Sequence, residues 1–174
     1  RGPGGWVDGG CFALEQGPEP ELAPEGVLLQ AIYLSLDPYL RGRMNEGKSY
    51  IPPVELGAVM RAGAVGKVIA SKHADFPVGA HVSGSFGVQE YCVTGARNVQ
   101  KIDVAAAPLE KWLNPLGMPG MTGYFGLLDV GLAKAGDTVV VSGASGAVGQ
   151  AAGQIARIKG CRTVGIAGGP EKCA

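Results

Sequence analysis

The sequence predicts two parts of different fold class, a β-rich domain followed by the first βαβ unit of a parallel α/β sheet. Several short strand-like runs, separated by Gly and Pro, fill the first part, a pattern typical of a β-barrel or β-sandwich. A strand, a glycine-rich turn, a helix and a second strand then follow one another within 137–167. We place the boundary near Pro108, which divides the chain into residues 1–107 and 108–174.

The first part contains one long predicted strand and several short ones. Residues 26–36 alternate in polarity and then run apolar, which predicts a strand that ends at Asp37 and Pro38. Residues 57–70 predict a hairpin broken at Gly63, with 65–69 as its second strand. The remaining predictions are an irregular or edge segment over 1–24, a turn into a strand over 75–82, and short strands over 89–93 and 98–102.

The second part begins with helical and loop segments and then becomes a βαβ unit. Residues 138–141 are apolar and mostly β-branched, so we expect a strand that is buried on both faces. From Ala147 onward the apolar residues recur on one face of a helix, and Gly160 is placed to end it in a left-handed conformation. Residues 162–167 predict the second strand, and the crossover between the strands should be right-handed.

The turn between strand and helix has the chemistry of a phosphate site. Gly143, Gly146 and Gly149 recur there at a spacing of three, one residue off the usual GxGxxG fingerprint. Gly143 allows the tight turn, Gly146 lets a pyrophosphate approach the backbone, and Gly149 lets the helix pack closely on the strand. The free N–H groups of the first helical turn, which includes Ala147 and Val148, would bind the anion. The alternative is a tight turn without a ligand.

The residues after the second predicted strand indicate whether the cofactor is NAD or NADP. NAD sites usually place an acid at this strand end to bind the ribose 2′-hydroxyl. Here the strand runs into Gly168, Gly169 and Pro170, and Lys172 follows, which favours the 2′-phosphate of NADP. Glu171 could instead serve an NAD ribose, and Lys172 could be a solvated surface lysine.

Composition gives no sign of nucleic-acid or membrane binding. The 174 residues carry 15 basic and 15 acidic side chains, and the sequence pI is about 6.9. The four cysteines are scattered with no CxxC, which indicates reduced thiols and a cytoplasmic location. No run is long and apolar enough to span a membrane, and no signal peptide is recognisable.

Four strings occur in order along the chain: YLSLDPYLRGRM over 33–44, SYIPPVELG over 49–57, GMPGMTGYFGL over 117–127 and SGASGAVGQAAGQIA over 142–156. Together they resemble the medium-chain dehydrogenase/reductase superfamily, within it the zinc-independent branch of prostaglandin reductases, leukotriene B4 dehydrogenases and curcumin reductases. The resemblance implies a GroES-like β-barrel domain followed by the start of an NADP-binding Rossmann domain. It also implies NADPH-dependent reduction of the C=C bond of α,β-unsaturated ketones and aldehydes, and a homodimer in the full-length protein.

The metal ligands of the superfamily's zinc-dependent members have no counterpart here. Those members carry a Cys after the first long strand and a Gly-His-Glu further on. Residues 36–44 contain no Cys, and residues 52–64 contain no His. The two histidines, His73 and His81, are not paired with a Cys at ligand spacing, so we predict no metal site.

Without a metal, the carbonyl oxygen of an enone needs a hydrogen-bond donor as negative charge develops on it. The resemblance places Tyr50 at the mouth of the active site, so Tyr50 is the candidate catalytic and substrate-binding residue, with a packing role as the alternative. Phe86 is a second candidate for the substrate pocket, with a core position as the alternative. Arg41 and Arg43 could bind the cofactor or a substrate carboxylate, although we favour a solvated or salt-bridged role.

Two further residues match family positions beside the nicotinamide end of the cofactor. These are Met118 and Thr122. The Thr122 hydroxyl could bind the carboxamide or the ribose, or it could cap the helix that follows.

The main departure from the family is length, because its members are about twice as long and a doubly wound sheet needs about six strands. We therefore expect the 174-residue piece alone to be inactive, with 138–141 as an exposed apolar edge. The first hypothesis is part of an NADP-dependent alkene reductase. The alternatives are a quinone reductase of the same superfamily and a truncated, non-catalytic binding or interaction module.

Overall fold

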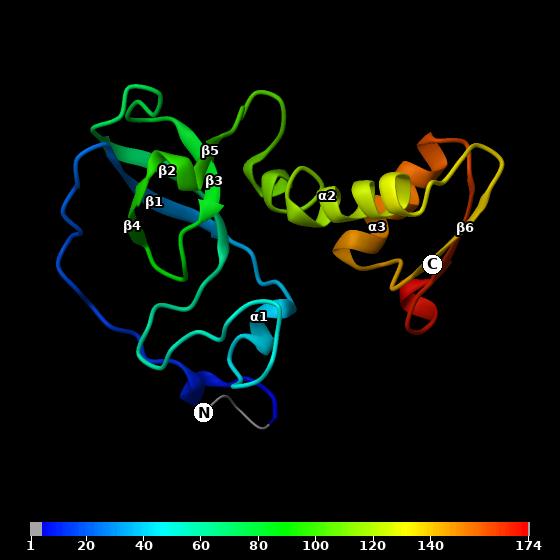
Figure 1. The fold of residues 1–174 in the computed structure, drawn as a ribbon, viewed down its shortest axis with the longest axis horizontal. Coiled ribbons are helices and arrows are strands. Elements are labelled where there is room, and N and C mark those ends of the chain that lie inside the picture. Colours follow the sequence, from blue (N-terminus) through cyan, green and yellow to red (C-terminus); the bar gives the residue numbers. More distant parts are fainter. Residues whose placement is uncertain (1–4, 174) are drawn as a thin grey trace. The chain divides into compact units, whose positions relative to one another are not determined.

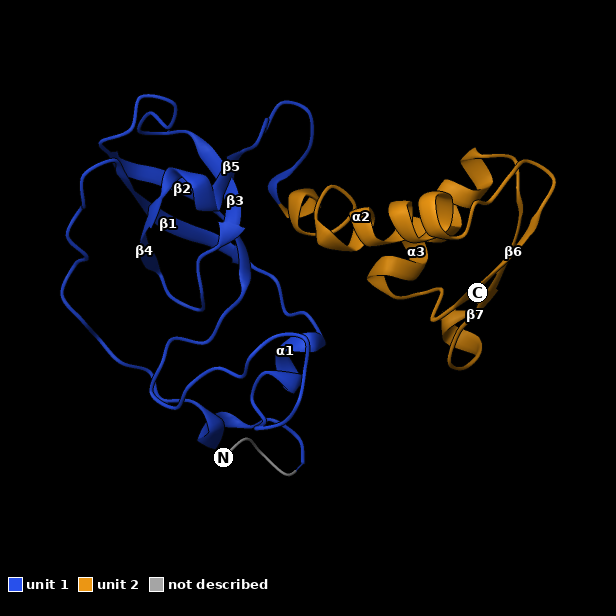
Figure 2. Ribbon diagram, viewed as in Figure 1, with its two compact units in different colours: residues 1–109 blue, residues 110–174 orange. Residues whose placement is uncertain are grey.

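The computed structural model describes residues 5–173 of the chain. It divides into two compact units, residues 1–109 and 110–174, which are coloured separately in Figure 2. Each unit is described by itself below. In the described part of the chain, no helix has the length and apolar character that a bilayer crossing requires.

Unit 1 is built on one antiparallel sheet of five strands in the order β4-β1-β2-β3-β5 (Figure 1). The register of β1 against β2 shifts at two places, between Leu28 and Leu29 and between Ala31 and Tyr33. Such irregularities bend a strand and increase its twist, which curls the sheet. The strands are β1 (Gly26–Leu34), β2 (Gly63–Ser71), β3 (His81–Ser85), β4 (Tyr91–Gly95) and β5 (Val99–Lys101).

The core of unit 1 is formed largely by side chains of this sheet and includes an aromatic ring. Phe86, only 3% exposed, packs with buried side chains of β1, β2 and β3, among them Leu29, Val68 and Val82. A Cβ at Gly66 would lie 3.0 Å from the Phe86 ring, and a Cβ at Gly84 would lie 2.9 Å from it. The two glycines therefore make room for the ring.

The helical segments of unit 1 are short. The helix α1 (Tyr39–Gly42) follows β1, and the 3-10 turns η1 (Gly9–Cys11) and η2 (Ala96–Asn98) lie near the N-terminus and between β4 and β5. Leu40 is the buried residue of α1.

Unit 2 is a pair of packed helices beside a two-stranded parallel sheet. In β6 (Thr138–Ser142) and β7 (Arg162–Ile166), Val140 pairs with Val164, and α3 (Ala147–Ile158) connects the strands. The earlier segments are η3 (Leu109–Leu113), α2 (Met118–Phe125) and the π-helical η4 (Gly126–Val130), and η5 (Pro170–Lys172) comes last.

The predicted fold class, a β domain followed by a βαβ unit, is confirmed, with one wrong strand. Residues 57–62 form no strand, so the hairpin predicted over 57–70 is absent and β2 begins at Gly63. The segment instead bonds to the loop after β3, where the Val88 N–H donates to the Met60 carbonyl at 2.7 Å. The predicted β-barrel is not closed: among the described residues its strands form an open sheet, with β4 and β5 as the edge strands.

The prediction that residues 138–141 are buried on both faces is wrong for these 174 residues. Burial alternates along β6, with Val139 and Val141 half-buried and Val140 61% exposed. The helix α3 packs against both strands but covers only one face of a sheet. A run of β-branched residues is typical of a strand whose two faces are both covered. Here only one face of β6 is covered, because the described residues include no second layer of helices on the other face.

Candidate cofactor and active site

The predicted phosphate turn has the geometry that an anion site needs. Gly143 directly follows β6 with φ +60°, in the left-handed region that favours glycine. The Gly146 N–H donates to the Gly143 carbonyl at 2.9 Å, which closes the turn, and α3 begins at the next residue. Gly146, the N-cap, offers no side chain to the helix start, so the N–H groups of the first turn are left for a ligand.

The turn is held tightly against the helix. A Cβ at Gly149 would overlap the Gly143 carbonyl oxygen and would lie 2.8 Å from the Ala144 Cα. Gln150 Nε2 donates to the Ser145 carbonyl at 2.8 Å, so the helix also fixes the middle of the turn. The residues therefore fit a pyrophosphate: a fixed turn without side chains at the helix start, next to the positive end of the helix dipole.

The segment 168–172, which is proposed to select NADP over NAD, lies at the same edge of the sheet as the phosphate turn. The Ala144 N–H donates to the Ile166 carbonyl at 3.0 Å, so the turn is joined to the carboxyl end of β7. Gly169 follows with φ +88°, and Lys172 ends the exposed turn η5. Glu171, the residue that could favour NAD, lies in the same turn and is exposed as well.

The helix α2 packs closely on the helix that follows the turn. A Cβ at Gly123 would lie 3.0 Å from the Ala152 nitrogen and 3.2 Å from the Val148 oxygen, so a side chain there would push the two helices slightly apart. Thr122, one residue earlier, lies in the turn of α2 that meets the first half of α3. Met118, the first residue of α2, is 52% exposed.

The alternative that Thr122 caps a helix is wrong. Thr122 lies inside α2, whose N-cap is Gly117. Its hydroxyl donates to the Met118 carbonyl one turn earlier, at 2.8 Å. The bond leaves the two oxygen lone pairs available as acceptors, so a cofactor amide could still bind there. The nicotinamide-side roles of Met118 and Thr122 stay predictions.

The two substrate candidates of unit 1 differ strongly in exposure. Tyr50 is 84% exposed in the loop after α1, so its phenol is accessible to a ligand. Phe86 is buried in the core, as the alternative interpretation had it, although one edge lines a hollow between 53–61 and 86–89. Tyr50 does not line this hollow, and the substrate roles of both residues stay predictions.

Sequence reasoning missed two polar residues of that hollow. Arg61 and Gln89 line it together with Arg43 and Phe86. Burial raises the pKa of the Cys92 thiol, and the hydrogen bond from Gln89 and the charge of Arg61 partly offset that rise. A cation inside the otherwise small and apolar stretch 58–66 was the signal that could have revealed Arg61.

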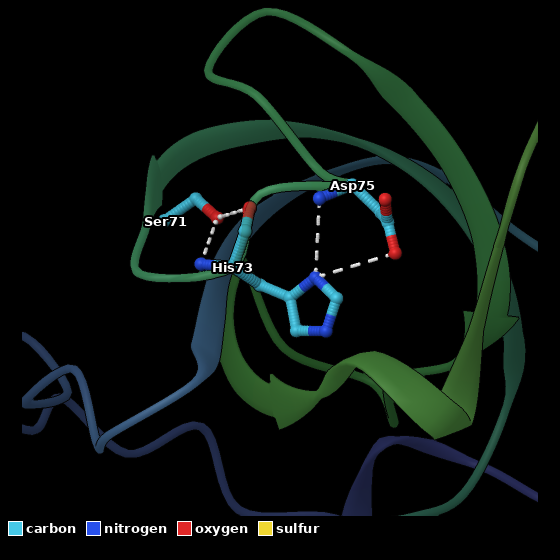
Figure 3. Close-up of polar contacts among 3 residues, drawn as sticks. All are labelled: Ser71, His73 and Asp75. Carbon is cyan, nitrogen blue, oxygen red and sulfur yellow. Dashed lines mark hydrogen bonds and ion pairs between the residues drawn. The ribbon is translucent and has the colours of Figure 1, made fainter.

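No metal cluster is formed by the described residues, since no three His, Cys, Asp or Glu side chains come together. His73 is instead part of the β2–β3 turn (Figure 3). Its N–H donates to Ser71 Oγ at 3.0 Å, and its ring nitrogen Nδ1 accepts from the Asp75 N–H at 3.2 Å. The Asp75 carboxylate is 3.9 Å from the same nitrogen. His73 therefore shapes the β2–β3 turn.

Comparison with known proteins supports the interpretation of the turn 143–149 as part of an NADP site. A family described as "N-terminal domain of oxidoreductase" matches residues 1–102. The chain is 47% identical over 165 residues to "NADPH-dependent curcumin reductase" of Escherichia coli, covering 93% of this chain and 47% of that protein. It is 40% identical over 173 residues to "Prostaglandin reductase 1" of Mus musculus, covering 98% of this chain and 50% of that protein.

A solved structure extends the similarity to three dimensions. The crystal structure of CurA from Vibrio vulnificus superposes with a TM-score of 0.91 at 46% identity, over 98% of this chain and 50% of that one. A structure of the same protein in complex with NADPH superposes with a TM-score of 0.90. The chain thus spans about half the length of the curated relatives it matches.

Proposed function

The chain belongs to the zinc-independent medium-chain dehydrogenases/reductases, in the curcumin and prostaglandin reductase branch, and from that premise we propose its reaction. The proposed reaction is NADPH-dependent reduction of the C=C bond of α,β-unsaturated ketones and aldehydes. The observation that carries the proposal is the turn 143–149, where a left-handed glycine and a helix start without a side-chain cap follow a parallel strand. A relative named for NADPH-dependent reduction is 47% identical to this chain over 165 residues.

Each part of this chain has a task in the proposed reaction. The backbone N–H groups of Ala147 and Val148 bind the pyrophosphate, Gly146 leaves room for it to approach, and Lys172 pairs with the 2′-phosphate. When bound, NADPH supplies the hydride that the β-carbon of the enone accepts, and negative charge develops on the carbonyl oxygen. The Tyr50 hydroxyl donates a hydrogen bond to that oxygen, and the α-carbon then takes a proton from water.

The test of the reaction is NADPH oxidation by the complete protein with methyl vinyl ketone and, separately, with a benzoquinone. We expect oxidation that depends on the enone, with the saturated ketone as product. Tyr50→Phe should lower kcat by about tenfold or more, because one donor to the developing oxyanion is lost. Tyr33→Phe is the matched control, since Tyr33 lies on β1 and has no role in the proposal. Turnover of the quinone but not of the enone would favour the quinone reductase.

The choice of NADP over NAD has a separate test at Lys172. Lys172→Ala should weaken NADPH binding by about five- to tenfold and leave NADH binding unchanged, because an exposed ion pair contributes about 1 kcal/mol. Lys159→Ala removes an exposed lysine at the opposite end of α3 and serves as the control. Equal affinity of the unmodified protein for NADH and NADPH would contradict the assignment and would favour Glu171 as a ribose ligand.

The proposal also covers location and assembly. The four cysteines, Cys11, Cys92, Cys161 and Cys173, are free thiols, which supports a cytoplasmic location. The family membership supports a homodimer of the complete protein, and sedimentation equilibrium tests it. A complete protein that binds neither NADPH nor an enone would favour the alternative, a non-catalytic interaction module.

A further inference from the structure

The phosphate turn, residues 143–149, lacks the side-chain cap that orders the start of most helices. Such a cap accepts a hydrogen bond from an N–H of the first helical turn. The N-cap of α3 is Gly146, and no side chain caps the helix there. The N–H groups stay available for an anion, but the helix start loses the order that a cap provides. Another contact then has to hold the turn in place.

Gln150 supplies such a contact from inside the helix. Its Nε2 donates to the Ser145 carbonyl at 2.8 Å. Across residues 5–173, no backbone N–H donates to that carbonyl, so the Gln150 amide provides its hydrogen bond within the protein. Ser145 is half-buried and Gln150 is exposed, so the bond runs from the helix surface to the middle of the turn.

The bond joins the residue before the N-cap to the fourth residue of the helix. In a hydrophobic staple these two positions are apolar and pack together, which fixes the angle at which the chain enters the helix. Here Ser145 and Gln150 occupy them, and a hydrogen bond takes the place of the apolar contact. Because the bond ends on a carbonyl, it uses none of the N–H groups that would meet the phosphates.

The same peptide group is held from its other side as well. The Ser145 carbonyl and the Gly146 N–H belong to one planar peptide unit. Its N–H donates to the Gly143 carbonyl at 2.9 Å, and its carbonyl accepts from Gln150 at 2.8 Å. The two bonds together fix the rotation of this unit, which leads directly into the first N–H groups of α3.

We propose that Gln150 is a positioning residue of the cofactor site, because its bond to the Ser145 carbonyl holds the turn in the arrangement that binds the pyrophosphate. In this role Gln150 acts through the backbone and not by contact with the cofactor. Without the bond, the turn adopts the binding arrangement for a smaller fraction of the time, and the apparent Kd rises in inverse proportion. This inference rests on the proposed function and deepens it, because it adds a residue that determines dinucleotide affinity.

The test measures the Kd of NADPH, NADH and adenosine 2′-monophosphate for the complete protein by isothermal titration calorimetry. Gln150→Met keeps the length and the helix propensity of the side chain but removes the donor. We expect the Kd of NADPH and that of NADH to rise by the same factor, about three- to tenfold, because one hydrogen bond is lost. Adenosine 2′-monophosphate, which carries no pyrophosphate, should bind as tightly as it binds the unmodified protein.

Gln154→Met is the matched control. Gln154 is an exposed glutamine of the same helix, and its Nε2 donates to the Gln150 carbonyl at 3.2 Å. That bond lies within α3 and does not reach the turn. The substitution should therefore change none of the three dissociation constants.

The other outcomes each contradict a different statement. Equal NADPH affinity of Gln150→Met and Gln154→Met would overturn the positioning role and leave the proposed reaction intact. If Gln150→Met weakens adenosine 2′-monophosphate by the same factor as NADPH, the bond supports the fold rather than the pyrophosphate turn, and the proposal is wrong. If the unmodified complete protein binds neither dinucleotide, the cofactor assignment fails, and the proposed function fails with it.

Discussion

Replacing Gly149 by alanine tests how the phosphate turn is built. The added Cβ would overlap the Gly143 carbonyl oxygen and lie 2.8 Å from the Ala144 Cα. Both atoms belong to the backbone, so no side-chain rotation relieves the overlap. The turn must move away from the start of α3, and overpacking of this kind costs about 1–3 kcal/mol.

A second glycine of the same helix provides the matched control. A Cβ at Gly153 would meet only Thr163 Cγ2, at an ordinary 3.7 Å. Each substitution gains about 1 kcal/mol of helix propensity, so the difference between the two variants isolates the overlap at the turn. We expect Gly153→Ala to stabilise the protein and Gly149→Ala to be about 1–3 kcal/mol less stable than Gly153→Ala.

The assay is urea unfolding of both variants, together with NADPH binding followed by cofactor fluorescence. Gly149→Ala should weaken NADPH binding by about tenfold or more, because the displaced turn misaligns the N–H groups of the anion site. Gly153→Ala should bind as tightly as the unmodified protein. Equal stability and equal NADPH affinity of the two variants would refute the packing role of Gly149.

Three further predictions concern unit packing, backbone strain and thiol reactivity. Phe86→Ala should destabilise unit 1 by about 3–5 kcal/mol in urea unfolding, because the ring is buried; a loss near zero would contradict a core role. Leu132 has φ +51°, in the left-handed region, so Leu132→Gly should raise the free energy of unfolding by up to about 1 kcal/mol in urea unfolding. Leu36→Gly, at an exposed position without positive φ, should not raise it. Alkylation of Cys92 should titrate above the usual thiol range because burial raises its pKa, and Arg61→Gln should raise that midpoint further; an unchanged midpoint would show that the Arg61 charge does not reach the thiol.

The βαβ unit could be predicted closely because local chemistry determines it. The glycine at position 143 must adopt positive φ, and Gly160, with φ +79°, ends the helix as expected. The predicted helix start at Ala147 agrees with α3. These features depend on contacts between near neighbours in sequence, which a single sequence displays directly.

The features that could not be predicted depend on contacts between distant segments. The segment 57–62 looks like a strand by pattern, but its partner is the loop after β3 rather than a neighbouring strand. Phe86 could be a pocket or a core residue by pattern, and only Gly66 and Gly84 on adjacent strands show that space for its ring exists. Arg61 and Arg43 lie apart in the sequence, and only the fold brings them to the same hollow.

The most direct measurement of the proposed reaction follows a deuterium label from the cofactor. The complete protein is incubated with an enone and NADPH deuterated at the nicotinamide C4 on the transferring face, and the product is examined by NMR. The proposed reaction predicts one deuterium on the β-carbon of a saturated ketone, with the α-carbon proton taken from water. Deuterium on the carbonyl carbon of an allylic alcohol, or an unlabelled product, would contradict reduction of the C=C bond by this protein.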